Sequence, residues 1–212
     1  MEPELVIFDC DGVLVDSEPL SNRILAELLT AEGLPTTADD SIRLFMGRSW
    51  ASVAALVEQR LGHPLPGGFS ARYLDTLFEA FERELEPVAG VTDALDAIAL
   101  PTCVASSGSH ERIRTALRAT GLLDRFDGRI FSATDVEHGK PAPDLFLHAA
   151  TRMVFEPSRC VVVEDSPAGV QAARAAGMPV LGYAGRTDAA QLSREGARAF
   201  GDMRALPALL AG

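Results

Sequence analysis

Two carboxylates separated by one residue follow an apolar run near the start of the chain, in the segment Val6-Ile7-Phe8-Asp9-Cys10-Asp11-Gly12. In extended backbone, successive side chains alternate, so Asp9 and Asp11 project to one side and Cys10 to the other. Gly12 then permits a sharp turn. Close carboxylates repel each other unless a cation or a shared proton compensates. The pair therefore suits a site with a hard metal ion and a carboxylate nucleophile. The alternative interpretation is an Asp-rich turn that only caps the next element.

A hydroxyl cluster follows a second apolar run and precedes a helical pattern. It consists of Ser106, Ser107 and Ser109, with Gly108 between them. Hydroxyls and backbone N–H groups at the start of a helix can bind a phosphate group. An ordinary serine N-cap is the alternative interpretation.

The chain has 19 basic residues, of which 18 are arginines and one is a lysine, Lys140. Pro141 and Pro143 stiffen the backbone beside this lysine and fix the direction of its charge. A solvated loop lysine is the alternative. Further along, Glu164 and Asp165 follow another apolar run. They either cap the next helix or complete an oxygen site for Mg²⁺.

The elements that must position these residues form an α/β pattern, in which short apolar runs alternate with segments of helical periodicity. Because ligands bind at the carboxyl ends of strands in a parallel sheet, all four groups are expected to meet at one edge. We therefore predict a Rossmann-like parallel sheet covered by helices. The predicted strands are Leu5–Phe8, Cys103–Ala105, Arg129–Ser132, Val161–Val163 and Val180–Tyr183.

Residues 17–85 break this rhythm, because they contain amphipathic helical patterns and no convincing strand. Leu20, Ile24 and Leu28 mark one helix, and two further patterns follow on either side of the Gly- and Pro-rich loop 62–68. We predict an all-helical domain over residues 17–85, inserted into a core of residues 1–16 and 86–212.

Charge and composition exclude several classes of partner. The net charge is −11, and the basic residues do not cluster in the sequence. Both observations argue against binding to a nucleic-acid backbone or to an anionic membrane surface. No apolar run is long enough to span a bilayer. The acidic N-terminal residues do not resemble a secretory signal, so we expect a cytoplasmic protein. The three cysteines lie in apolar runs without metal-site spacing, and we expect reduced, buried thiols.

These residues resemble the four motifs of the haloacid dehalogenase (HAD) superfamily, in order and approximate spacing over essentially the whole chain. The resemblance rests on the segments Asp9-Cys10-Asp11-Gly12-Val13-Leu14-Val15-Asp16-Ser17-Glu18, Ser106, Lys140 and Glu164-Asp165-Ser166-Pro167-Ala168-Gly169. The helical insertion is similar to the helical cap of that family. The sequence most resembles sugar-phosphate phosphatases and β-phosphoglucomutases, and in general pattern the bacterial 6-phosphogluconate phosphatases.

The resemblance implies a role for each motif residue. Asp9 would be the nucleophile that takes the phosphoryl group, and Asp11 the general acid and base. The Asp9 carboxylate, the Asp11 carbonyl and Asp165 would coordinate Mg²⁺, with Glu164 helping through water. The phosphoryl group would be held by Ser106, Ser107 and Lys140.

Two departures from the mutases favour hydrolysis over phosphoryl rearrangement. The mutases carry a cap-loop arginine three residues after a glycine and a histidine in the first cap helix; here Gly47 is followed directly by Arg48, and Ser21 stands at the histidine position. Arg48 would contact a distal anionic group of the substrate or lie on the surface. Trp50 either faces the substrate or, as we favour, fills the cap core.

We therefore expect a Mg²⁺-dependent phosphatase of small phosphorylated metabolites, most closely sugar or sugar-acid phosphates, acting as a monomer. A phosphomutase that uses the same aspartyl-phosphate is the first alternative. A catalytically idle interaction protein on the same scaffold is the second, and no motif favours it, because every expected catalytic position is filled.

Overall fold

The computed structural model of the chain describes residues 2–45 and 50–212. The chain divides into two compact units. The first, which we call the core unit, comprises Met1–Asp16 and Glu86–Gly212, and the second, the helical unit, comprises Ser17–Leu85. The sequence analysis divided the chain at the same residues. That the helical unit acts as a cap stays a prediction.

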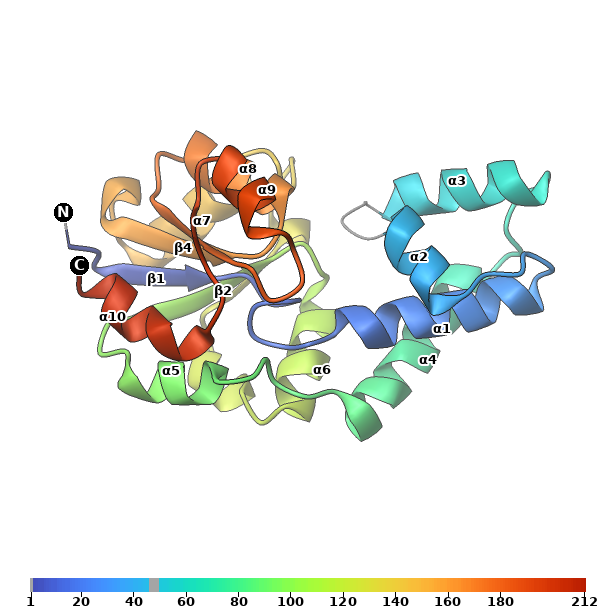
Figure 1. The fold of residues 1–212 in the computed structure, drawn as a ribbon, viewed down its shortest axis with the longest axis horizontal. Helices are drawn as coiled ribbons and strands as arrows, with labels where there is room; N and C mark the ends of the chain where they lie inside the picture. Colours follow the sequence, from blue (N-terminus) through green and yellow to red (C-terminus); the bar gives the residue numbers. More distant parts are fainter. Residues whose placement is uncertain (1, 46–49) are drawn as a thin grey trace. The chain divides into compact units, whose positions relative to one another are not determined.

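A parallel sheet that contains β1, β2 and β4 forms the centre of the core unit (Figure 1). Its described strands follow the order β3-β2-β1-β4-β5-β6. This is the Rossmann-like sheet that the sequence predicted. The five predicted strands are all present, within one residue at each end, and the edge strand β6 adds a sixth. Their bounds are β1 Leu5–Phe8, β2 Thr102–Ser106, β3 Ile130–Ser132, β4 Cys160–Glu164, β5 Val180–Tyr183 and β6 Arg198–Phe200.

The central strands are largely apolar, in keeping with helices that cover both faces of the sheet. All four residues of β1 and all five of β4 are buried, which is the pattern of a strand covered on both sides. In Figure 1, α7, α8 and α9 lie on one side of the sheet, and α5, α6 and α10 lie on the other. These helices span α5 Val91–Ala97, α6 His110–Ala119, α7 Asp144–Met153, α8 Pro167–Ala175, α9 Ala189–Arg194 and α10 Leu206–Leu210.

One hydrophobic core of this unit lies between the sheet and the helices α7 and α8. Leu5 and Ile7 of β1 pack there with Phe146 and Ala149 of α7 and Val170 of α8. Four 3₁₀ turns complete the described part of the unit: η1 Leu123–Phe126, η2 Ala133–Asp135, η3 Pro157–Arg159 and η4 Met203–Ala205.

The helical unit has its own small core. Its described helices are α1 Glu18–Ala31, α2 Ala38–Phe45, α3 Trp50–Leu61 and α4 Phe69–Glu84. Leu25, Leu29, Val57 and Phe69 lie at the centre of the core. The sequence predicted α1, α3, α4 and the loop between α3 and α4 but not α2. No described helix of either unit is both long and apolar enough to cross a bilayer.

The cysteines are free thiols and all three are buried, as the sequence predicted. Burial raises the pKa of the Cys10 thiol well above its usual value, and it raises the pKa of Cys160 to about 11. Because the thiolate is the reactive form, these residues behave as apolar packing groups.

Candidate active site

Three neighbouring strands deliver polar side chains to the same edge of the sheet. Asp9 directly follows β1, Ser106 ends β2 and Glu164 ends β4. Both β2 and β4 pair with β1, and the Asp9 N–H donates to the Val163 carbonyl at 2.9 Å, so the ladder extends one residue past β1. The parallel register therefore places Asp9 between the ends of the other two strands.

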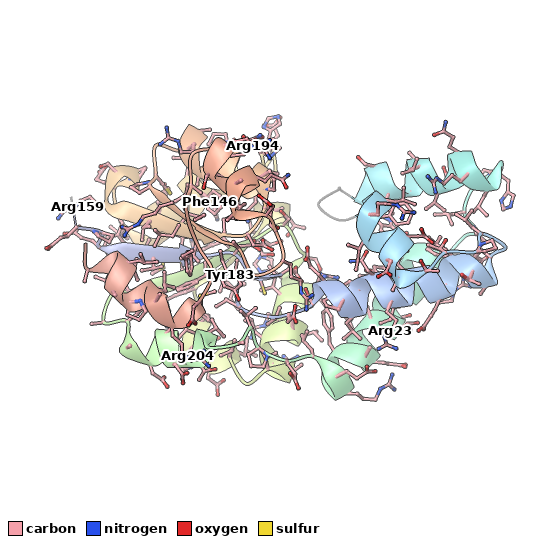
Figure 2. The ribbon with its side chains drawn as sticks, viewed as in Figure 1. Arg23, Phe146, Arg159, Tyr183, Arg194 and Arg204 are labelled. Atoms are coloured by element: carbon pink, nitrogen blue, oxygen red, sulfur yellow. The ribbon has the colours of Figure 1, made fainter. Side chains whose placement is uncertain are left out.

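Lys140 connects these strand ends. Its ammonium group donates to Asp9 Oδ1 at 2.6 Å, to Glu164 Oε1 at 2.7 Å and to the Ala105 carbonyl at 3.1 Å. The side chain is only 4% exposed, and the nitrogen lies 4.8 Å from the centre of the Phe146 ring (labelled in Figure 2). A lysine that reaches three acceptors inside the protein is not a solvated loop lysine. The structure thus brings Lys140 together with the two acidic motifs.

Burial and charge act against each other in this cluster. Burial raises the pKa of Asp9 to about 7, although Lys140 acts in the opposite direction. Burial would lower the pKa of Lys140, but the charges of Asp9 and Glu164 outweigh it and hold that pKa above its usual value. The lysine therefore stays protonated, and the buried Asp9 carboxylate holds a proton more readily than an exposed aspartate does.

Glu164 is held through both of its oxygens. Oε1 accepts from Lys140, and Oε2 accepts from the N–H of Ser166 at 2.8 Å and from its hydroxyl at 2.9 Å. The hydroxyl of Ser166 also accepts from the Gly169 N–H at 3.1 Å, which caps α8. A Cβ on Gly169 would lie 1.8 Å from Glu164 Oε1, so the glycine makes room for this carboxylate. The start of α8 therefore fixes Glu164 in place.

Asp165 lies against the turn that follows Asp9. Gly12 has a φ of +80°, and a Cβ built there would lie 2.1 Å from Asp165 Oδ2. The Gly12 N–H donates to the Val15 carbonyl at 2.8 Å, which closes the turn. Asp165 is 6% exposed. Its carboxylate thus packs on the backbone that carries the Asp11 carbonyl, the group predicted to share a metal ion with it.

A divalent cation fits the charges of these residues. If all are ionised, the four carboxylates face the two cations Lys140 and Arg112, which leaves a net charge of −2. Among the residues that the structure describes, no three His, Cys, Asp or Glu side chains form a metal-holding group by themselves. The predicted Mg²⁺ ligands instead combine two side chains with a backbone carbonyl and a water-mediated contact. The four carboxylates are Asp9, Asp11, Glu164 and Asp165.

The serine loop after β2 is folded over the same edge. Ser106 is buried, and its hydroxyl accepts from the Gly108 N–H at 3.2 Å. The Ser132 hydroxyl at the end of β3 donates to the Gly108 carbonyl at 2.7 Å. Ser109 caps α6 by accepting from the Arg112 N–H. Ser107 is exposed. That Ser106 and Ser107 hold a phosphoryl group stays a prediction.

Arg112 is a residue of this site that the sequence analysis did not single out. Its Nη2 donates to Asp11 Oδ1 at 2.9 Å, and its Nε donates to Asp11 Oδ2 at 3.4 Å. The two side chains are 18% and 27% exposed. The signal available in the sequence is its position, three residues after the serine cap and in the first turn of α6.

The sequence offers two candidates in the helical unit for contact with the substrate, Arg48 and Trp50. Arg48 lies outside the described residues, so its contact with a substrate anion stays a prediction. Trp50 stacks on Tyr73, with the ring centres 5.2 Å apart, and its indole N–H donates to the Ser70 hydroxyl. Trp50 therefore packs against the core of the helical unit, as we favoured, but its side chain is still 36% exposed to solvent.

Several known proteins are similar to this chain in sequence and in fold. Residues 3–177 match the model of the haloacid dehalogenase-like hydrolases. The chain is 32% identical to the 6-phosphogluconate phosphatase of Escherichia coli K12, over 84% of this chain and 81% of that protein. It is 34% identical to the fructose-1-phosphate phosphatase YqaB of the same strain, over 83% and 94%.

A solved structure supports the same assignment. A HAD family hydrolase from Deinococcus radiodurans R1, with bound phosphate and sodium, superposes with a TM-score of 0.81 at 30% identity, and the match covers 99% of this chain and 97% of that one. The family model spans most of the chain, and the two relatives named above are phosphatases that align over 81% and 94% of their own lengths. The chain therefore belongs to the haloacid dehalogenase-like hydrolase family and is a phosphatase of that family.

Proposed function

We propose that this phosphatase hydrolyses the phosphate monoesters of small sugars or sugar acids, with Mg²⁺, through an aspartyl-phosphate on Asp9. The observation that carries the proposal is the position of Lys140. Its ammonium group contacts Asp9 and Glu164 together, at the edge where Ser106 also ends its strand. A carboxylate nucleophile, a buried cation and a hydroxyl at one edge of a sheet suit phosphoryl transfer.

In the first step, an oxygen of the Asp9 carboxylate attacks the phosphorus atom. The P–O bond to the leaving alcohol breaks while a P–O bond to Asp9 forms, and Asp11 gives its proton to the alkoxide. In the second step, Asp11 takes a proton from a water molecule that attacks the same phosphorus. The bond to Asp9 breaks, and inorganic phosphate leaves. One water is consumed for each ester cleaved.

The positive charges of Lys140 and of a bound metal ion would reduce the electrostatic repulsion between the attacking carboxylate and the phosphate dianion. Lys140 is fixed by three hydrogen bonds and stays charged, so its field is in place before the substrate arrives. Bound Mg²⁺ would supply the remaining positive charge, held by Asp9, the Asp11 carbonyl and Asp165, with Glu164 helping through water. The Ser106 hydroxyl and the Ser107 N–H would orient the transferring oxygens.

The substrate class follows from the relatives. Two phosphatases that align with more than four-fifths of this chain are named for 6-phosphogluconate and fructose 1-phosphate. We carry over to this chain what these substrates share, a small polyhydroxylated molecule with one phosphate ester. Arg48 is our candidate for an anionic group at the far end of such a molecule.

Phosphate release tests the proposal. The purified chain is incubated with Mg²⁺ and a panel that includes 6-phosphogluconate, fructose 1-phosphate and β-glucose 1-phosphate. We expect Asp9-dependent release on at least one of them, and a loss of at least about a thousandfold in kcat for Asp9→Asn, because a nucleophile is removed. Asp124→Asn, an exposed aspartate of the core unit, is the matched control and should keep full activity.

Each contrary result points to a specific alternative. Turnover that Asp9→Asn leaves intact would rule out the aspartyl-phosphate. If glucose 1,6-bisphosphate makes the isomerisation of β-glucose 1-phosphate faster than phosphate release, the chain is a mutase. If no ester is cleaved and beryllium fluoride with Mg²⁺ fails to raise the Tm of the chain, the site is idle.

A further inference from the structure

We propose that Arg112 is a positioning residue, which orients the carboxylate of Asp11 for its proton transfers. The inference rests on the proposed function, in which Asp11 is the acid and base. The two side chains are 101 residues apart in the sequence, and they meet through a two-point contact of 2.9 and 3.4 Å. Because the guanidinium group is a planar fork, such a contact fixes the direction of a carboxylate as well as its location.

The Arg112 side chain packs closely against the serine loop at Gly108. A Cβ on Gly108 would lie 3.2 Å from Cδ of Arg112 and 3.6 Å from its Cγ, so the arginine stem passes closely over a residue that has no side chain. At its other end, the Arg112 N–H is held by the Ser109 cap, and the neighbouring Ile113 is fully buried. The stem therefore has little freedom, and the guanidinium group is held in front of Asp11.

The place of Arg112 in its helix supports a specific role. Arg112 lies in the first turn of α6, where the helix dipole disfavours a positive side chain. A cation kept there needs a compensating partner, and Asp11 supplies it. Asp11 lies three residues beyond the end of β1, in a turn where its side chain is 27% exposed. Arg112 contacts both oxygens of that carboxylate and so restricts its orientation.

The contribution of a positioned general acid to the rate increases with the basicity of the leaving group. p-Nitrophenolate leaves as a stable anion, whereas phenolate gains more from a proton donated as the P–O bond breaks. Phenyl phosphate and p-nitrophenyl phosphate have nearly the same shape but differ in this requirement. The ratio of their kcat/KM values therefore reports the action of Asp11, separately from any general damage to the site.

The experiment measures this ratio in Arg112→Met, in Arg112→Lys and in Asp11→Asn. We expect Arg112→Met to lower kcat/KM for phenyl phosphate about tenfold more than for p-nitrophenyl phosphate. Arg112→Lys should restore part of the ratio, because it returns one donor. In the Asp11→Asn background, Arg112→Met should leave the ratio unchanged, since the group that it orients is gone. Arg118→Met, at an exposed arginine of the same helix, controls for the loss of charge.

An equal loss on both substrates, no loss, or a gain would overturn the positioning role. If Arg112→Met does not fold, Arg112→Lys and Gly108→Ala decide the matter, because a methyl group on Gly108 would displace the arginine stem. Gly108→Ala should then lower the ratio in the same direction. Failure of the proposed function gives a different result: turnover of both substrates would survive in Asp9→Asn or be absent from the unaltered chain, and either outcome also ends the role of Arg112.

Discussion

The two units of the chain handle polar side chains in opposite ways. Among the described residues, the core unit buries the carboxylates of Asp9, Glu164 and Asp165. In the described part of the helical unit, the polar residues that are buried as a whole are neutral, namely Ser17, Asn22 and Ser41, although one carboxylate oxygen of Glu18 is also buried. The ion pairs described in the helical unit lie at its surface, such as the pair between Arg23 (labelled in Figure 2) and Glu84.

This difference separates groups kept for chemistry from groups kept for stability. Burying a charge costs several kcal/mol unless it is paired and hydrogen-bonded, and well-packed apolar residues are often as stable. A fold gains little from acids concentrated at one edge of a sheet. The helical unit is stabilised by the burial of a small apolar core.

Lys140→Met should have the largest effect. It leaves Asp9 and Glu164 buried without their ammonium partner, and we expect a loss of about 3 kcal/mol in the free energy of unfolding and about a thousandfold in kcat. The Asp9 pKa, already raised to about 7, should rise further. A raised native pKa means that the folded state keeps a proton that the unfolded state releases, so stability falls as pH rises. The loss should therefore be smaller at pH 5.5 than at pH 8.

Urea unfolding at the two pH values measures this effect. The control is Arg194→Met, at an exposed arginine labelled in Figure 2, which should change stability by less than about 0.5 kcal/mol. A loss for Lys140→Met that does not depend on pH would mean that the carboxylates around it are not the cause.

Gly12→Ala should come second, with Gly62→Ala of the helical unit as its matched control. The two glycines have φ values of +80° and +77°. An alanine pays about 1 kcal/mol for that conformation at either site. At Gly12 the new methyl group would also meet Asp165, whereas nothing lies within 4 Å at Gly62. We expect Gly12→Ala to cost about 3 kcal/mol and about a hundredfold in kcat.

Unfolding and turnover of the two variants, measured side by side, decide the point. If both alanines cost the same and Gly12→Ala stays active, then Asp165 is not held against the turn.

Sequence reasoning recovered the buried strands because burial on both faces leaves a continuous apolar run. It missed β6, a strand of three residues at the edge of the sheet whose Arg198 is exposed. It also missed α2, a helix of only eight residues in which Ser41 and Phe45 are buried. Short or half-exposed elements owe their form to the neighbours on which they pack, and local pattern does not carry that information.

The same limit applies to the site. Asp9, Lys140 and Glu164 follow apolar runs or stand out by rarity, and the parallel sheet brings them together. Arg112 gave no such signal, because an arginine in a helical pattern is typical of a surface residue. Its contact with Asp11 depends on how the serine loop folds over the strand ends. Glycines that make room for carboxylates, such as Gly169, are equally invisible until the packing is known.

The burial of Asp9 also predicts a proton-linked metal affinity. With the Asp9 pKa at about 7, a Mg²⁺ ion that uses this carboxylate must displace a proton at lower pH. The apparent Kd for Mg²⁺ should therefore rise about tenfold for each pH unit below 7 and level off above it. Calorimetric titrations at pH 5.5, 6.5 and 8, in buffers of different ionisation enthalpy, give both the affinity and the protons released. Asp9→Asn should remove this dependence, and a Kd that stays constant with pH would contradict the assignment.

The smallest effects belong to the helical unit, where a buried neutral contact should outweigh a surface ion pair. The Ser41 hydroxyl donates to Asn22 Oδ1 at 2.8 Å, and Ser41 is fully buried, so Ser41→Ala should cost about 1 kcal/mol. Arg23 and Glu84 are 2.6 Å apart, but their side chains are 42% and 48% exposed. Arg23→Gln should therefore cost less than about 0.5 kcal/mol, and less still in high salt. Urea unfolding at low and high salt gives both numbers. A larger loss for Arg23→Gln would mean that charge stabilises the helical unit as well, and the burial of charge would then no longer single out the core unit as the place of the chemistry.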